Sequence, residues 1–193
     1  MMTTVLGRLA TIQMGYTFRA ALQASQDGAI AVIQMKDLAA DDTVDCSSLT
    51  RIDMEDPGEH HLVQPGDLIF RSRGLLSTSA ILLHNPGKAV VAAPLIRMRV
   101  NNADAILPEY LNWYISQKDA QSYLTSRARG TTQKMIGVDA LKDLEIALPP
   151  LEIQRSIVDL AALSRIERKL ILAIAEKRQQ YVQGSLNKLL KGD

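Results

Sequence analysis

Residues 149–184 read PPLEIQRSIVDLAALSRIERKLILAIAEKRQQYVQG, and this stretch decides the architecture of the chain. After the two prolines, side chains recur at steps of three and four residues, the spacing of one face of an α-helix. The positions are Ile153, Ile157, Leu160, Leu163, Ile166, Leu170, Ile174 and Tyr181, with Lys177 as a polar member. The first helix breaker is Gly184, so the pattern predicts an amphipathic helix of about 32 residues, roughly 48 Å long.

This helix is long for a chain of 193 residues, and an isolated helix with a bare apolar stripe is marginal in water. We therefore expect a coiled-coil-type pairing with a second helix, although a helix that lies across its own domain remains an alternative. The charge balance also changes near residue 150. Residues 1–150 hold 14 basic and 16 acidic side chains, whereas residues 151–193 hold 8 and 5. The sequence thus predicts a globular domain over 1–150 and a helical one over 151–193.

The globular part has the pattern of an α+β domain with a mixed or antiparallel sheet. Short apolar runs bounded by Gly, Pro, Asp and Asn predict strands at 29–34, 67–72, 79–83, 88–92 and 95–100. In the last run Arg97 and Arg99 alternate with apolar residues, which predicts a strand with one solvent-facing side. Pro108 starts a helical pattern that runs through Ile115 and continues less clearly to Leu124.

Composition excludes several classes of protein. With 47% hydrophobic residues and a net charge of +1, the chain is folded and has no overall basic field. A single cysteine, Cys46, cannot form an intrachain disulfide, and no Cys/His spacing fits zinc. Arg8 interrupts the apolar segment that a signal peptide would need, and no apolar run is long enough to span a bilayer. We expect a cytoplasmic protein without a metal or another cofactor.

Catalytic motifs are missing from the sequence. It contains no GxxxxGK[ST] phosphate loop, no GxSxG nucleophile elbow and no HExxH zinc helix. The pair His60-His61 lies in a polar stretch typical of a surface turn. Glu167-Arg168-Lys169 has the ExK form of some nuclease sites, but no acidic partner precedes it at the right place. The sequence therefore predicts that the chain is not an enzyme.

Two segments carry donors suited to phosphate and base edges. In DLIFRSRG (67–74), Arg71 and Arg73 flank Ser72 and project from one face of a strand end. The segment RARGTTQK (127–134) supplies Arg127, Arg129, Thr131, Thr132, Gln133 and Lys134. These residues are candidate DNA contacts. Two alternatives stay open: an arginine of the first segment pairs with one of the eight acids between Asp37 and Glu59, and the threonines only cap a turn.

Five features in order along the chain identify a family. They are LGRLATIQMG (6–15), Lys36-Asp37-Leu38 after a strand, PGDLIFRSRG (65–74), Pro108-Glu109-Tyr110-Leu111, and RGTTQKMIGVDALKDLEIALPPLEIQRSIV (129–158). The most specific part runs from Gly130 to Val158 and includes a Glu-x-Gln-x-x-Ile helix start. With these features the chain resembles the specificity subunits of type I restriction-modification systems.

The resemblance implies a target recognition domain that reads a few base pairs of one half of a bipartite site in double-stranded DNA. Lys36 joins the candidate contacts. The resemblance also implies a noncatalytic protein whose partners are a DNA methyltransferase subunit and, through it, a restriction subunit. The C-terminal helix would be a spacer that packs antiparallel against a second such helix.

A full specificity subunit carries two recognition domains and two helices, whereas this sequence has one of each and looks like a half subunit. A homodimer through the helix would cover the apolar stripe. Two other functions remain open: an assembly protein whose helix binds a partner without DNA readout, and a recognition domain detached from a fused methyltransferase-nuclease.

Overall fold

The computed structural model describes residues 2–74, 77–130 and 134–191, and the chain divides into two compact units, Met1–Arg155 and Ser156–Asp193. The strands of the first unit are β1 (Met2–Val5), β2 (Ala10–Met14), β3 (Ile30–Ile33), β4 (Thr50–Ile52), β5 (Leu68–Phe70), β6 (Ser79–Ile81), β7 (Ala89–Val91), β8 (Ile96–Val100) and β9 (Glu145–Leu148). Its helices are α1 (Leu6–Leu9), η1 (Met35–Asp37), η2 (Glu59–His61), α2 (Pro108–Ile115), α3 (Lys118–Arg127) and α4 (Val138–Lys142). Helix α5 (Leu151–Lys191) starts in this unit and continues through the second.

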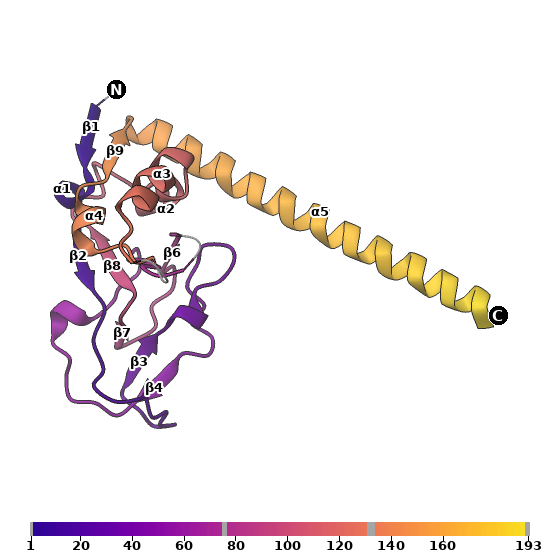
Figure 1. Ribbon diagram of the computed structural model, residues 1–193, viewed down its shortest axis with the longest axis horizontal. Coiled ribbons are helices and arrows are strands. Elements are labelled where there is room, and N and C mark those ends of the chain that lie inside the picture. The colour runs from indigo at the N-terminus through magenta and orange to yellow at the C-terminus, as the bar shows by residue number, and fades with distance from the viewer. Residues whose placement is uncertain (1, 75–76, 131–133, 192–193) are drawn as a thin grey trace. The chain divides into compact units, whose positions relative to one another are not determined.

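The strands form three sheets, which confirms the predicted α+β class. An antiparallel sheet has the order β2-β8-β5-β6, and β1 pairs antiparallel with β9. The third sheet, β4-β3-β7, is mixed, because β3 runs antiparallel to β4 and parallel to β7. In Figure 1, β3 and β4 lie at the end of the first unit opposite to β1 and β9.

The central strands are apolar throughout and therefore buried on both faces. Every residue of β3 (IAVI) and of β5 (LIF) is buried. Side chains of β3, β5, β6 and β7 share one apolar cluster, so the mixed sheet and the antiparallel sheet have a common core. A tight turn precedes β5: Gly66 has a φ of +89°, and the backbone N–H of Gln64 donates to a carboxylate oxygen of Asp67 at 2.9 Å.

The expectation of a solvent-facing side on β8 is wrong. The alternation is correct, but Arg97 is only 5% exposed, and its guanidinium donates to Leu62 O (2.8 Å) and Gln13 Oε1 (2.9 Å). Arg99 forms an ion pair with the fully buried Asp67 through two 2.7 Å hydrogen bonds. Burial lowers the pKa of Arg97, whereas the hydrogen bonds to Asp67 raise that of Arg99. The hydrogen bonds of Arg97 and Arg99 therefore hold β8 in place within the domain.

Two helix boundaries also differ from expectation. The helical pattern that starts at Pro108 is broken, since α2 ends at Ile115 and α3 begins at Lys118. Gly184 does not end the C-terminal helix. Helix α5 continues to Lys191, giving 41 residues and a length of about 62 Å. One glycine inside a helix costs only about 1 kcal/mol relative to alanine, which a long helix tolerates.

Candidate nucleic-acid interface

The first candidate segment directly follows strand β5. Its three polar side chains, those of Arg71, Ser72 and Arg73, lie in different surroundings. Arg71 is half-buried and donates through Nη2 to the carbonyl oxygen of Leu38 at 2.5 Å. Its Nε is buried and has no hydrogen-bond partner among the described residues. One alternative was that an arginine of this segment pairs with an acid of the 37–59 region. Arg71 does contact that region, but its hydrogen bond goes to the backbone carbonyl of Leu38 and not to a carboxylate.

Ser72 and Arg73 differ sharply in their access to solvent. Ser72 is 2% exposed, and its hydroxyl donates to the carbonyl oxygen of Pro94. Its hydroxyl is thus used inside the domain, where it cannot meet a nucleic acid. Arg73 is exposed, and its Nε lies 3.4 Å from the sulfur of Met135. Of the three, Arg73 is the side chain that the fold leaves on the surface.

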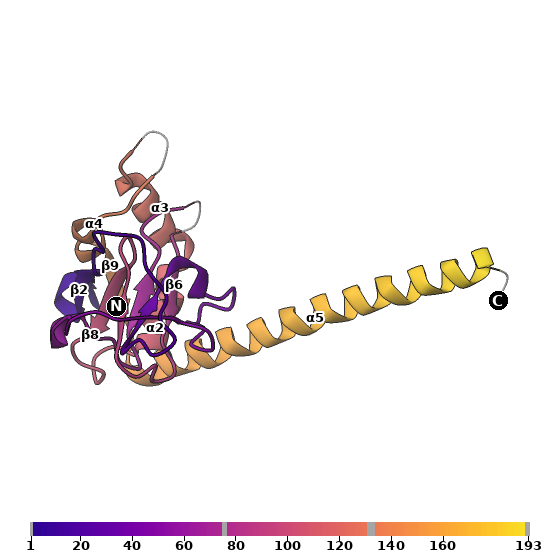
Figure 2. The same ribbon diagram turned by 90° about the horizontal axis from the view of Figure 1, so that it is seen from below.

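Backbone pairing brings the two candidate segments together. Arg129 N donates to Met135 O at 2.9 Å, and Met135 N donates to Arg129 O at 2.8 Å. On its other side Met135 pairs with Arg73, and Ile136 N donates to Ser72 O at 2.9 Å. Helix α3, which ends at the first residue of the second segment, lies at one end of the domain in Figure 2. Two segments more than fifty residues apart in the sequence are thus neighbours in the fold.

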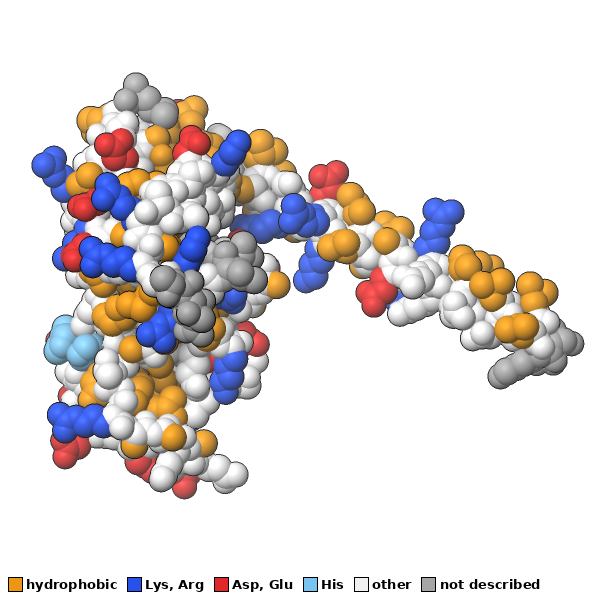
Figure 3. All heavy atoms as spheres, in the orientation of Figure 1, with side chains coloured by type: hydrophobic (Ala, Val, Ile, Leu, Met, Phe, Trp, Pro, Cys, Tyr) orange, Lys and Arg blue, Asp and Glu red, His pale blue; other side chains and the backbone are white. Residues whose placement is uncertain are grey.

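The end of α3 adds a further fixed cation. Arg127 is exposed, and its Cζ lies 5.4 Å from the centroid of the Tyr123 ring, one helical turn earlier. Lys134 is also exposed. We call Arg73, Arg127, Arg129 and Lys134 the basic cluster. Figure 3 shows several Lys and Arg side chains over the middle of one face of the domain, with Asp and Glu side chains both above and below them. Three other candidates, Thr131, Thr132 and Gln133, lie outside the described residues.

Lys36 belongs to a different part of the domain. It is exposed on η1, directly after β3, and its Nζ donates to Thr50 Oγ1 of β4 at 3.1 Å. The neighbouring Asp37 is buried, and its carboxylate accepts a hydrogen bond from the backbone N–H of Gln34 at 2.7 Å. Burial raises the pKa of Asp37 above its ordinary value. Lys36 is therefore placed on the mixed sheet, while the basic cluster lies beyond the end of β5.

Sequence reasoning missed the residues that assemble this site. Met135 pairs with both arginine-bearing segments, and no sequence signal marks an apolar residue for such backbone pairing. The Tyr123–Arg127 contact was detectable, because the two residues are four apart on a helical pattern. The carbonyl of Leu38, which receives Arg71, could not be found from sequence because backbone acceptors are the same at every position.

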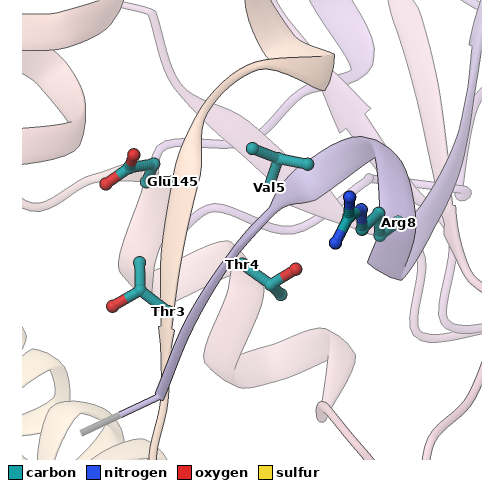
Figure 4. Close-up of a pocket in the computed structure, with 5 residues that line it drawn as sticks. All are labelled: Thr3, Thr4, Val5, Arg8 and Glu145. Carbon is teal, nitrogen blue, oxygen red and sulfur yellow. The ribbon is translucent and has the colours of Figure 1, made fainter.

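A shallow hollow elsewhere on the domain is lined by Thr3, Thr4, Val5, Arg8 and Glu145. Figure 4 shows the carboxylate of Glu145 turned away from Arg8, so the hollow does not bring an acid and a base together. Within the part of the chain that the structure describes, no three His, Cys, Asp or Glu side chains converge on a possible metal position. Over the same residues, no helix has both the length and the apolar character that crossing a membrane requires.

The predicted stripe of α5 lies largely on the surface of the chain. Ile157 is half-buried, and the others are exposed: Ile153 (50%), Leu160 (70%), Leu163 (63%), Ile166 (56%), Leu170 (58%) and Ile174 (68%). More exposed apolar side chains follow that the stripe did not include: Ile171, Leu172, Val182, Leu186, Leu189 and Leu190. Large apolar surfaces of this kind mark interaction sites in proteins.

Comparison with known proteins identifies relatives. The family model described as "Type I restriction modification DNA specificity domain" matches residues 1–180. A crystal structure of the HsdS subunit from Thermoanaerobacter tengcongensis aligns with a TM-score of 0.60 at 20% identity, over 87% of this chain and 37% of that one. No curated protein matches the chain.

Two further solved structures share the fold. One, from a study of complex assembly and conformational transition of the type I R-M system, has a TM-score of 0.65 at 21% identity and covers 97% of this chain and 43% of that one. The S subunit from M. genitalium has a TM-score of 0.56 at 12% identity, over 84% and 38%. The chain thus spans about two fifths of the length of each of these proteins.

Proposed function

Because the chain belongs to the family of type I restriction modification DNA specificity domains, we propose that it reads a short sequence in double-stranded DNA as one half of a bipartite site. The family match confirms the resemblance predicted from the motifs. The specificity subunits of this family are noncatalytic, in agreement with the expectation that the chain is not an enzyme.

The observation that carries the proposal is the pairing of Met135 with both Arg73 and Arg129. Arginine forks recognise guanine edges and phosphates bidentately, and a fixed separation of two arginine backbones would let both forks read neighbouring groups at once. The Met135 pairings supply that separation. We propose that Arg73 and Arg129 contact bases and that Arg127 and Lys134 position the phosphate backbone. Ser72 is left out of this interface because it is buried.

We further propose that residues 1–150 act as the recognition domain and residues 151–193 as a spacer that pairs with the same helix of a second copy. The exposed stripe on α5 supports this pairing, since burying apolar surface contributes about 25 cal/mol per Å². A two-fold axis would bury the same side chains of both copies. Linking two weak readers in this way makes the second half-site contact intramolecular.

The partners of the dimer in this proposal are a DNA methyltransferase subunit and, through it, a restriction subunit, acting in the cytoplasm. Family membership supports them, because a specificity domain selects the target for other subunits. A second candidate function is that of an assembly protein that does not read DNA. The exposed apolar surface of α5 favours it equally, because such a surface would bind a partner chain.

Salt dependence of DNA binding separates these two functions. We expect the full chain to bind random-sequence duplexes with an affinity that falls steeply as the salt concentration rises. A plot of the logarithm of the association constant against the logarithm of the salt concentration should have a slope of about −0.9 for each phosphate that the chain neutralises. Arg127→Ala should reduce this slope by about one phosphate, whereas Arg19→Ala, at an exposed position in the loop after β2, should leave it unchanged. The absence of salt-dependent binding would favour the assembly protein.

A further inference from the structure

Met135 contacts Arg73 through its side chain as well as through its backbone. The Nε of Arg73 donates a hydrogen bond to the thioether sulfur of Met135 at 3.4 Å. The two residues also form an antiparallel backbone bridge. Residues that lie opposite each other in such a bridge direct their side chains to the same face, so the sulfur contact follows from the backbone pairing. Met135 is half-buried and Arg73 is exposed, so this contact lies at the surface of the domain.

The backbone on both sides of Arg73 is held by further contacts. On one side, the backbone N–H of Ile136 donates to Ser72 O at 2.9 Å. On the other side, Nε2 of Gln121 in α3 donates to Ser77 O at 2.8 Å. The backbone of Arg73 therefore has a defined position, and the direction of its long side chain is what remains to be set.

The sulfur contact determines which edge of the Arg73 guanidinium stays available. A guanidinium has two edges that can each donate a pair of parallel hydrogen bonds: a side edge formed by Nε and one Nη, and an end edge formed by Nη1 and Nη2. Because the Nε–H is directed at Met135, the side edge is blocked. Among the described residues, Nη1 and Nη2 of Arg73 have no hydrogen-bond partner, so the end edge is free of contacts with them.

A thioether is better suited to this position than a charged acceptor. Methionine sulfur is a weak hydrogen-bond acceptor, so it orients the Nε–H without occupying the end edge. A carboxylate at the same place would hold the guanidinium more strongly, but it would cancel the charge of Arg73 and repel phosphate. An orientation that is set before binding also reduces the conformational entropy that the side chain loses on binding. Met135 thus orients Arg73 and leaves its charge intact.

We infer that Met135 is a positioning residue that presents the end edge of Arg73 to one guanine of the half-site. This inference rests on the proposed function and makes it more specific. In the major groove guanine offers two adjacent acceptors, O6 and N7, which match two parallel N–H groups of an arginine. A phosphate contact would not require control of the edge, because phosphate accepts hydrogen bonds from either edge and also from lysine.

The test measures how strongly the full chain distinguishes guanine from 7-deazaguanine, in which N7 is replaced by C–H. Duplexes carry the half-site selected by the unaltered chain, and each of its guanines is replaced in turn. We expect one position where the replacement weakens binding by about tenfold, the size of a disturbed base contact. At that position Arg73→Ala should bind the two duplexes equally.

Variants of Met135 separate the sulfur contact from the backbone pairing. Met135→Leu nearly keeps the size of the side chain and removes the sulfur, so the ratio of the two affinities at that guanine should fall to about twofold or less. Met135→Gln supplies an oxygen acceptor and should recover most of the ratio. Met2→Leu, the same substitution at an exposed position of β1, should leave the ratio unchanged. Because the ratio compares two duplexes bound by one variant, a general loss of affinity or of folded protein does not alter it.

Met135→Val offers a second way to remove the sulfur if Met135→Leu does not fold, because a β-branched side chain suits a paired, extended segment. If either folded variant keeps the full ratio, the role of Met135 is refuted while the proposed function stands. If no guanine of the half-site depends on Arg73, this inference fails alone. If the unaltered chain selects no half-site, the proposed function and this inference fail together.

Discussion

Arg129 and Met135 exchange a pair of backbone hydrogen bonds, 2.9 and 2.8 Å long. Arg73 pairs with the other side of Met135, so the three residues lie across neighbouring backbone segments. The positions of the two arginines are therefore coupled through the backbone and do not depend on side-chain contacts alone. The following predictions test what this arrangement does.

Replacing Arg73 or Arg129 with alanine should weaken DNA binding by about 1 to 3 kcal/mol for each lost base contact. The loss should be greatest for the selected sequence and smaller for random duplexes, because base contacts add specificity to a general phosphate attraction. Fluorescence anisotropy with both kinds of duplex measures the difference. Equal losses on both duplexes would show that the arginines bind only phosphate.

Asp67→Asn should lower the free energy of unfolding by about 3 kcal/mol. The carboxylate is fully buried between Arg99 and the Gln64 amide, and its removal leaves a partly buried guanidinium without its partner. Urea denaturation followed by circular dichroism measures the change. Glu145→Gln, a matched substitution at an exposed acid, should cost less than about 0.5 kcal/mol. Similar values for the two variants would contradict the structural role of the ion pair.

Leu170→Glu should convert the chain from a dimer to a monomer at micromolar concentration. The substitution places a charge in the exposed apolar stripe of α5, where pairing would bury it. Arg168→Glu introduces the same side chain two residues earlier, about 200° around the helix, and should leave the dimer intact. Light scattering gives the masses. A monomeric mass for the unaltered chain would contradict the homodimer.

Stability should fall at alkaline pH through Tyr110. Burial raises the pKa of its hydroxyl from 10.0 to about 12. Between these values the unfolded chain releases the proton and the folded chain keeps it, so the free energy of unfolding decreases as pH rises. In Tyr110→Phe this part of the decrease should disappear, although the variant starts about 1 kcal/mol less stable because it lacks the bond to Ala147. If the free energy of unfolding falls with pH equally in Tyr110→Phe and in the unaltered chain, Tyr110 is not the group responsible.

Much of the fold could be predicted because its signals are local. Apolar runs and turn residues located β3, β5, β6, β7 and β8, and helical periodicity located α5. The errors arose where tertiary contacts override local pattern. Arg97 alternates like a solvent-facing residue, yet Leu62 and Gln13 cover it. Gly184 marks a local break, yet α5 continues through it.

The candidate interface was predicted in part. Residue type identified Arg73 and Arg129 as donors, because arginine on a glycine-containing loop suits phosphate and guanine. Residue type could not show that Ser72 is buried or that Arg71 is held by Leu38, since both depend on contacts between distant segments. The pairing through Met135 is likewise a property of the backbone, and side-chain chemistry does not encode it.

The most direct test of the proposed function is selection of bound duplexes from a random pool by the full chain, with a methyltransferase subunit of the same system present. The account predicts two inverted copies of one short half-sequence, separated by unread base pairs and with centres at least about one helical turn apart. A continuous site, or two halves unrelated in sequence, would contradict the homodimer and indicate that another chain supplies a different second recognition domain.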